Sequence, residues 1–357
     1  MAYLNLNRTK LKENYSFLKT LFDQQNIEWG VVSKMFCGNR KYLKELIDLG
    51  VKEIHDSRIS NLAKVKEIAP SVQTVYIKPV SKRNLAKMVT YADVSLNSEL
   101  QTIRWISEEA VRQQKNHKII IMIETGDLRE GVMGEHLVDF YEQVFELPNI
   151  EVVGLGTNLN CLNGVLPSPD KLIQLSLYRQ IIELKFNREI PWVSAGTSVT
   201  IPLLLQKQLP KGINHFRVGE TLYFGLDLLE ERVIPGMHGD VFELNAEIIE
   251  MQQKPSLPTG DLGANPSGDF VDIDPSLYGV STFRAILDIG LLDVDPKFLL
   301  PDDPKIEILG ASSDMLIVNL ADNPKNYQVG DLLKFNLKYM GALHILNSSY
   351  VEKTISD

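Results

Sequence analysis

The sequence predicts an α/β fold, a TIM (β/α)8 barrel followed by a C-terminal antiparallel β domain. Over the first two thirds of the chain, short apolar runs alternate with segments of helical periodicity, and eight such strand–helix units can be counted. Strands that alternate with helices pair in parallel through right-handed crossovers, and eight units are the number that closes a barrel. An open doubly wound sheet is disfavoured, because the glycine-rich dinucleotide turn expected after its first strand is missing.

The barrel region begins with an amphipathic helix and continues with a strand. From Thr9 onward apolar residues recur at spacings of three and four, and an apolar run follows at 29–32. Seven further strand-like runs follow, separated by helix-length segments: Glu53–His55, Thr74–Ile77, Val94–Leu96, Ile119–Ile123, Val152–Gly154, Trp192–Ser194 and Phe216–Val218. The N-terminal residues 2–8 alternate like a strand and are a candidate strand of the β domain.

After about Gly236 strand-like patterns replace the helical ones. Residues 242–249 alternate, a Pro- and Gly-rich stretch covers 255–279, and short apolar runs follow at 284–287, 315–318 and 332–337. The sequence therefore predicts a barrel domain at 1–236 and a β domain at 237–357, with no helical periodicity in the second.

Composition excludes several classes of protein. The net charge of -9, from 37 basic and 46 acidic residues, argues against a nucleic-acid-binding surface. No uncharged apolar stretch approaches the roughly 18 residues that span a bilayer, and the N-terminus lacks the pattern of a signal peptide. Cys37 and Cys161 are too few for a disulfide framework and match no zinc-ligand spacing. We expect a soluble, cytoplasmic protein with a small-molecule partner.

Two polar loops lie where barrel enzymes hold phosphate, after the seventh and eighth strands. The first loop contains Ser194, Thr197 and Ser198, and the second runs through Gly219 and Glu220. Both supply hydroxyl or backbone N–H groups suited to a phosphate monoester. Either loop alone could be a helix cap or a turn, but the two together at these positions predict a phosphate site.

Lys34 ends the first barrel strand. A lysine at the mouth of a barrel can be desolvated, which lowers its pKa and makes the neutral amine a Schiff-base nucleophile. The ordinary alternative is a solvated lysine at the end of a strand. Opposite a phosphate site, however, a Schiff-base lysine is the arrangement that pyridoxal 5'-phosphate requires.

Several motifs in a fixed order resemble the alanine racemase-like fold type III enzymes that use pyridoxal phosphate. These motifs are Val31–Lys34, Glu124–Gly131, the Ser-x-Gly-x-Ser loop at 194–198 and Arg217–Gly219. Three further stretches, His55–Leu62, Gly156–Cys161 and Ile308–Asp314, look like the alanine/ornithine racemase branch, and the likeness extends to Lys353. The order and spacing of the motifs over nearly the whole chain carry the resemblance.

The resemblance implies roles for individual residues. Lys34 would hold the cofactor and move one proton, and Arg217 would donate to the pyridine nitrogen, which limits delocalisation of the carbanion into the ring. Arg129 would flank the phenolic oxygen of the ring, and Asn158 stands against the ring where alanine racemases have a histidine. The remaining residues implied in cofactor binding are Ser194, Thr197, Ser198, Gly219, Glu220 and Tyr339, the last of which could equally be a strand aromatic packed on its neighbours.

The departure from the family pattern concerns the second base. Racemisation needs a proton carrier on each face of Cα, because a single base returns the proton to the face it came from. In alanine racemases the second base is a tyrosine of the partner subunit, but Leu291 stands at that position here. Cys161 is the first candidate to replace it, with a thiol pKa expected to fall near a cationic site, although buried cysteines are commonly inert. The other candidates are Cys37, Asp293, Ser313, Asp314 and Tyr339.

Together these features predict a pyridoxal-phosphate-dependent amino-acid racemase, an isomerase, that forms a homodimer. It would interconvert L- and D-enantiomers through an external aldimine and Cα deprotonation, with ornithine or alanine tested first. A cofactor-homeostasis protein without turnover and a lyase or decarboxylase on the same fold are the alternatives. No metal site is expected, because the sequence shows no metal-like cluster among His117, His136, His215, His238 and His344.

Overall fold

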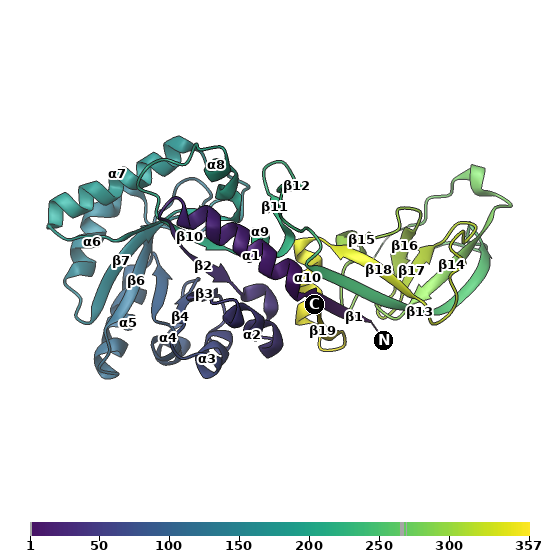
Figure 1. The fold of residues 1–357 in the computed structure, drawn as a ribbon, viewed down its shortest axis with the longest axis horizontal. Helices are drawn as coiled ribbons and strands as arrows, with labels where there is room; N and C mark the ends of the chain where they lie inside the picture. Colours follow the sequence, from purple (N-terminus) through teal and green to yellow (C-terminus); the bar gives the residue numbers. More distant parts are fainter. Residues whose placement is uncertain (1, 265–267, 269) are drawn as a thin grey trace. The chain divides into compact units, whose positions relative to one another are not determined.

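The computed structural model describes residues 2–264, 268 and 270–357, and the chain divides into two compact units (Figure 1). One unit is Arg8–Val241, and the other combines the N-terminal segment up to Asn7 with Phe242–Asp357. The chain thus starts in one unit, forms the whole of the other, and returns to the first.

The unit Arg8–Val241 contains a parallel sheet that closes into a barrel, and it includes every predicted barrel strand. In chain order the strands are β2 (Glu28–Val32), β3 (Glu53–Asp56), β4 (Gln73–Tyr76), β5 (Val94–Asn97), β6 (His117–Met122), β7 (Ile150–Gly156), β8 (Trp192–Ser194), β9 (Gly196–Thr197) and β10 (His215–Val218). Each strand pairs with the next in parallel from β2 to β8. β8 and β9 are separated only by Ala195, and β10 pairs with both β9 and β2, which closes the barrel.

The barrel helices alternate with these strands, as the periodicity predicts. They are α1 (Arg8–Asp23), α2 (Arg40–Asp48), α3 (Ile59–Ile68), α4 (Leu85–Tyr91), α5 (Leu100–Arg112), α6 (Leu137–Phe145), α7 (Pro169–Phe186), α8 (Ile201–Leu205) and α9 (Glu220–Phe224). Short 3-10 turns lie at Lys34–Phe36, Lys82–Asn84, Gly134–His136 and Ser198–Thr200. α1 buries Leu11, Leu18 and Phe22 on one face, and the Phe22 ring lies 4.9 Å from that of Phe216 on β10. Burial of each such side chain contributes about 1.5–3 kcal/mol.

The other unit is built on one long strand, β13 (Phe242–Pro255). The other strands of this unit are β1 (Tyr3–Asn7), β14 (Ser281–Leu287), β15 (Leu299–Pro301), β16 (Glu307–Ala311), β17 (Leu316–Asn319), β18 (Leu332–Leu337) and β19 (Glu352–Ser356). The first half of β13 pairs antiparallel with β1 and β18. From Ile248 onward β13 pairs antiparallel with β14, and this pairing contains a register shift between Ile248 and Glu250. β1 and β19, by contrast, pair in parallel. Short 3-10 turns lie at Pro275–Leu277 and Pro296–Phe298, and a small hairpin of the barrel unit pairs β11 (Leu226–Asp227) with β12 (Arg232–Val233).

The prediction that the β unit lacks helical structure is wrong, because α10 covers Tyr339–Asn347. The segment is apolar on nearly all sides, so its spacing carries no visible helical period. A Cβ atom on Gly341 would lie 2.9 Å from backbone and side-chain atoms of Phe298, which shows how closely the helix packs there. The interpretation of Tyr339 as a strand aromatic also fails, since Tyr339 begins this helix.

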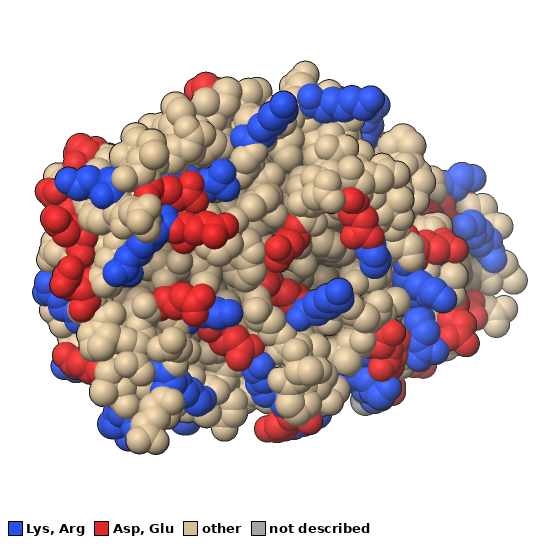
Figure 2. Space-filling model, turned by 60° about the vertical axis from the view of Figure 1, so that its left-hand side comes forward, with Lys and Arg blue, Asp and Glu red and all other residues tan. Residues whose placement is uncertain are grey.

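Charged groups lie interspersed on the face drawn in Figure 2, where Lys and Arg alternate with Asp and Glu. Within the part of the chain that the structure describes, no helix combines the length and the apolar character needed to cross a bilayer.

Candidate active site

The predicted site residues of the barrel unit meet at the carboxyl ends of its strands. Lys34 follows β2 by two positions, Asn158 follows β7 by two, Ser194 ends β8, and Arg217 and Gly219 lie in and just after β10. Because the strands are parallel, these ends share one edge of the barrel, which is where barrel enzymes carry their active sites.

Arg217 is the best-defined side chain of this edge. It is 6% exposed, and its guanidinium donates from Nη1 to Oδ1 of Asn158 (2.6 Å) and from Nη2 to the carbonyl oxygens of Thr157 (2.5 Å) and Ser194 (3.1 Å). Its Nε is buried and has no hydrogen-bond partner among the residues that the structure describes. Burial lowers the pKa of Arg217 to about 10, so the guanidinium remains charged at neutral pH.

The two predicted phosphate loops are joined through Ser198. Its Oγ accepts hydrogen bonds from the backbone N–H groups of Gly219 (3.3 Å) and Thr221 (3.2 Å). Thr197 caps the 3-10 turn that follows it, in a reciprocal arrangement with Thr200, so its capping role is visible. The loops therefore present a serine hydroxyl and backbone N–H groups at one place.

Ser194 and Glu220 have other surroundings. The Ser194 hydroxyl lies 2.7 Å from Nδ1 of His215, inside the barrel, while its carbonyl oxygen accepts from Arg217. Burial raises the pKa of Glu220, and the nearby charge of Lys34 opposes part of that rise.

Arg129 and Arg217 are connected through a residue that the sequence analysis missed. The Arg129 guanidinium forms a bidentate ion pair with Glu130, including an Nη2–Oε1 contact of 2.7 Å. The Asn158 amide donates to the same Oε1 of Glu130 and accepts from Arg217. The chain of contacts Arg129–Glu130–Asn158–Arg217 therefore crosses the mouth of the barrel. In the sequence, this chain of contacts is indicated only by the position of Glu130 directly after Arg129.

Lys34 and Cys161 are both exposed at this edge. The exposure of Lys34 means that the chain itself does not supply the desolvation expected there. The Cys161 thiol donates to the carbonyl oxygen of Leu159 at 3.3 Å. Partial desolvation raises the pKa of Cys161, and the charges of Arg129, Arg217 and Lys34 offset only part of that rise. The expected lowering of this pKa is therefore wrong, and the thiol is mainly protonated at neutral pH.

Four further predicted residues, Asp293, Ser313, Asp314 and Tyr339, belong to the β unit, whereas Cys37 belongs to the barrel unit. Asp314 is exposed and accepts from the hydroxyl of Ser313 at 3.1 Å, and Tyr339 is half-buried at the start of α10. Asp293 accepts from the hydroxyl of Ser348 at 2.6 Å. Leu291 is 44% exposed.

A second cluster lies inside the barrel, where β3 and β10 bring together Glu53, His55 and His215. One ligand-type atom of each lies within 4.8 Å of the others, and of the five histidines considered in the sequence this group contains His215. Nε2 of His215 lies 2.9 Å from Oε1 of Glu53, and Nε2 of His55 contacts the same oxygen. Oε2 of Glu53 accepts from Gln73 at 2.5 Å. These contacts define a hydrogen-bonded cluster, in which one carboxylate holds two imidazoles.

Burial and hydrogen bonding act in opposite directions on this carboxylate. Burial raises the pKa of Glu53, but the two imidazoles lower it further, so the net pKa lies well below its usual range. Burial lowers the pKa of His55, which keeps that ring neutral. Glu53 and His55 are two positions apart on β3, whereas His215 is remote in sequence and reaches Glu53 only in the closed barrel.

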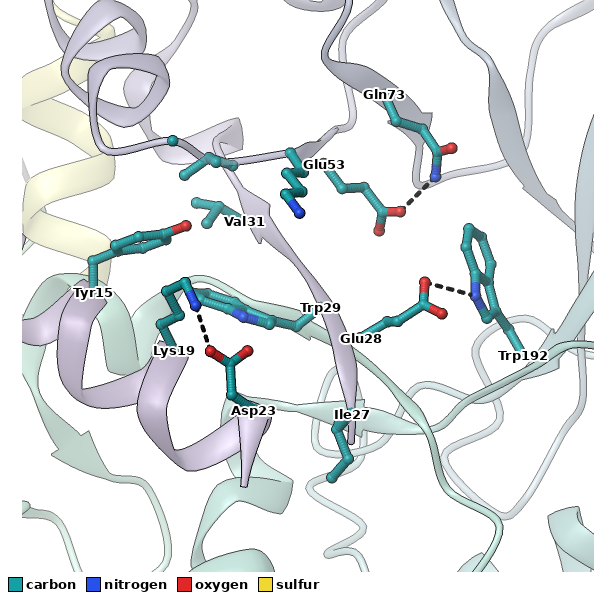
Figure 3. A pocket seen from close by; sticks show the side chains of 13 residues that line it. Tyr15, Lys19, Asp23, Ile27, Glu28, Trp29, Val31, Glu53, Gln73 and Trp192 are labelled. Atoms are coloured by element: carbon teal, nitrogen blue, oxygen red, sulfur yellow. Dashed lines mark hydrogen bonds and ion pairs between the residues drawn. The ribbon is translucent and has the colours of Figure 1, made fainter. Parts of the chain in front are cut away.

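A cavity of about 350 Å³ opens near Glu53 at the amino ends of the strands (Figure 3). Gln73 and Trp192 line it, and Trp192 donates from its indole to Oε2 of Glu28 at 3.2 Å. The cavity lies at the opposite ends of the strands from Lys34 and Arg217. In barrel folds the residues at this amino end serve stability.

Fold and site together define a class of protein, a barrel enzyme with a lysine, a buried arginine and a hydroxyl-lined loop pair at its mouth. Residues 6–227 match the family described as "Alanine racemase, N-terminal domain". The chain is 38% identical over 353 residues to the ornithine racemase of Acetoanaerobium sticklandii, covering 99% of each chain. It is 31% identical over 353 residues to the lysine racemase of Thermotoga maritima, covering 98% of this chain and 97% of the relative.

A solved structure shares the fold. The alanine racemase from Bartonella henselae with covalently bound pyridoxal phosphate aligns with a TM-score of 0.75 at 17% identity, covering 99% of both chains. The family match over residues 6–227 and the two relatives show that the protein belongs to the alanine racemase family. It is an amino-acid racemase, an isomerase.

Proposed function

We propose that the protein is a pyridoxal 5'-phosphate-dependent racemase whose first substrate is ornithine, with lysine and alanine next in order. The ornithine and lysine racemases named above, which match nearly the whole chain, support this order. The observation that carries the cofactor assignment is the buried Nε of Arg217. A buried donor without a partner is costly, and the ring nitrogen of the cofactor is an acceptor that would satisfy it.

The other residues at this edge also fit the cofactor. Lys34 would hold it covalently, and Ser198 with the backbone N–H groups of Gly219 and Thr221 would bind its phosphate. Arg129 and Asn158 would flank its ring, and Ser194, Thr197, Glu220 and Tyr339 remain predicted contacts. When bound, the cofactor stabilises the negative charge that develops at Cα.

Two proton carriers complete the proposal. The Lys34 amine takes a proton from Cα on one face or returns one there. The Cys161 thiol, whose raised pKa keeps it protonated, delivers a proton to the other face. Leu291 has no titratable group, so it cannot take the part of the tyrosine that the family pattern has. Asp314 remains the alternative carrier from the β unit.

Arg217 and its partners set the charge around these carriers. The guanidinium keeps its proton at neutral pH, so it donates a hydrogen bond without taking part in proton transfer. The Glu130 carboxylate, held by Arg129 and Asn158, supplies negative charge between the two arginines. The carboxylate therefore offsets part of the repulsion between the guanidinium groups of Arg129 and Arg217.

The proposal includes a cytoplasmic homodimer. A content of two cysteines, Cys37 and Cys161, suits a reducing compartment. The resemblance to alanine racemases, in which a partner subunit contributes to the site, supports dimerisation.

One experiment tests the reaction. The protein is incubated with pyridoxal phosphate and single enantiomers of ornithine, lysine and alanine in heavy water, and optical rotation and deuterium at Cα are followed. Loss of rotation with one deuterium incorporated supports racemisation, whereas unchanged rotation and no deuterium across the panel contradict it.

Two variants test the residue roles. Lys34→Ala should abolish the visible absorption band of the bound cofactor, and survival of the band would show that the lysine does not hold it. Cys161→Ser should lower kcat by about 100- to 10,000-fold, the range of general acid–base catalysis. Wild-type racemisation in that variant would exclude the thiol.

A further inference from the structure

Asp127 has a buried carboxylate that binds the loop after β7. The residue is 1% exposed and lies in the loop after β6. Its Oδ2 accepts from the N–H groups of Cys161 (3.1 Å) and Leu162 (2.9 Å), and its Oδ1 from those of Asn163 (3.1 Å) and Val165 (3.3 Å). Four backbone donors thus converge on one carboxylate.

Further contacts fasten the same two loops together. The hydroxyls of Thr125 and Thr157 lie 2.7 Å apart, and the Asn163 amide donates to the backbone oxygen of Asp127 at 2.7 Å. A backbone hydrogen bond from the N–H of Glu124 to the carbonyl oxygen of Val132 (3.0 Å) closes the base of the first loop. Both loops are therefore ordered around Asp127.

The carboxylate keeps its charge in this position. Burial raises the pKa of Asp127, but the four backbone N–H groups lower it further, so the net pKa lies below its ordinary value. A charged acceptor binds N–H donors more strongly than a neutral one.

The two loops carry two groups that interact electrostatically at the mouth of the barrel. Arg129 follows Asp127 by two positions, and Cys161 is the first residue whose N–H the carboxylate binds. The Arg129 charge acts on the Cys161 thiol. Any movement of one loop past the other changes the position of the thiol relative to this charge.

We propose that Asp127 is a positioning residue, which holds the Cys161 thiol at a fixed position relative to Arg129 across the mouth of the barrel. The proposal rests on the proposed function of Cys161 as a proton carrier. Both carboxylate oxygens of Asp127 are occupied by backbone N–H groups, so Asp127 acts through the loop that it binds.

Asp127→Asn is the direct test. The amide retains one oxygen and places an NH2 donor against backbone N–H groups that also donate, so two of the four bonds lose their acceptor. The loop of Cys161 should loosen, and the thiol should lose its desolvated position. A misplacement of about 1 Å at a reacting group can cost about 100-fold in rate. We expect kcat to fall about 10- to 100-fold with KM changed less than about threefold.

The readout that does not depend on activity is alkylation of the thiol. Iodoacetamide is applied to the cofactor-loaded protein over a range of pH, and peptide mass spectrometry separates Cys161 from Cys37. Because the thiolate is the reactive form, a thiol released toward its ordinary pKa should react at least about threefold faster at pH 8. Asp227→Asn is the matched control: Asp227 is 7% exposed in the same unit, and its Oδ1 accepts from the N–H groups of Leu229 (2.9 Å) and Glu230 (3.1 Å).

The outcomes separate this proposal from the proposed function. Faster alkylation in Asp127→Asn but not in Asp227→Asn supports the positioning role, even if Cys161→Ser should leave racemisation intact. Alkylation and kcat equal to wild type in Asp127→Asn overturn it, whatever Cys161→Ser does. If Asp127→Asn does not fold, Asn163→Ala removes a single bond between the loops, and it should show the same changes at smaller size. Wild-type alkylation in Asn163→Ala would then overturn the proposal.

Discussion

Replacing Glu53 by leucine tests whether the buried hydrogen-bonded cluster stabilises the barrel. Glu53→Leu removes the carboxylate but leaves the rings of His55 and His215, both with 0% exposure. Replacing a whole buried ionic cluster with apolar side chains can leave the stability of a protein unchanged. Removing one partner, by contrast, leaves the other buried polar groups without a hydrogen-bond partner. The variant is therefore expected to destabilise the barrel unit.

The size of the effect follows from the contacts that are lost. Each fully buried imidazole N–H that loses its acceptor costs about 1–3 kcal/mol. Gln73 is half-buried and can turn toward water, and the added leucine atoms recover part of the loss by apolar burial. We expect Glu53→Leu to lower the free energy of unfolding by about 3 kcal/mol. Glu53→Gln retains one acceptor oxygen for both rings, so it should cost about half as much.

Tryptophan fluorescence during guanidinium unfolding is the assay, because Trp29, Trp105 and Trp192 all lie in the barrel unit. Glu28→Leu is the matched control, since Glu28 is exposed, lines the same cavity and makes one hydrogen bond to Trp192. Glu28→Leu should lower the free energy of unfolding by less than about 1 kcal/mol. A loss in Glu53→Leu no larger than that in Glu28→Leu would refute the reasoning.

Three further predictions concern the cofactor site, pH and barrel closure. Arg217→Lys loses the planar fork that makes three hydrogen bonds and should weaken pyridoxal phosphate binding at least about tenfold in a fluorescence titration; unchanged affinity would contradict the assignment. Folding lowers the pKa values of both His55 and Glu53, whose values in the unfolded chain are about 6.5 and 4.3. The contribution of each group to the free energy of unfolding is therefore complete above its unfolded pKa and is lost as pH falls through its folded pKa. Barrel stability measured by unfolding should therefore decline from about pH 6.5 downward, and a flat profile from pH 7 to 4 would be inconsistent with this. Gly196→Ala would bring a Cβ within 2.1 Å of the Phe216 ring and should destabilise the barrel by about 1–3 kcal/mol, whereas a wild-type melting curve would show that the strand junction has room.

The barrel could be predicted from sequence because each of its units shows a local pattern. The apolar runs at 119–123 and 216–218 lie in buried strands, and the spacing of Leu11, Leu18 and Phe22 is that of one helix face. α10 could not be predicted in this way, since an apolar segment on all sides has no period to detect. The parallel pairing of β1 with β19 likewise joins the two ends of the chain, a contact that no local pattern reveals.

The site could be predicted only in part. The positions of Lys34, Arg217 and Ser198 after successive strands follow from the rule that parallel strands share one edge. The link through Glu130 and the binding of four N–H groups by Asp127 depend on how two loops fold against each other, which spacing does not encode. The direction of the Cys161 pKa was mistaken for the same reason, since the balance between desolvation and three nearby charges depends on their placement.

By itself, the sequence determined the strand–helix alternation, and with it the barrel and the edge where the site residues gather, because apolar periodicity and turn residues are local properties of the chain. Only the tertiary structure decided which side chains contact each other: Glu53 with His215, Arg217 with Asn158, and Asp127 with the loop of Cys161. Burial, hydrogen-bond partnership and pKa depend on distances between residues that are remote in sequence, and these distances exist only once the barrel has closed.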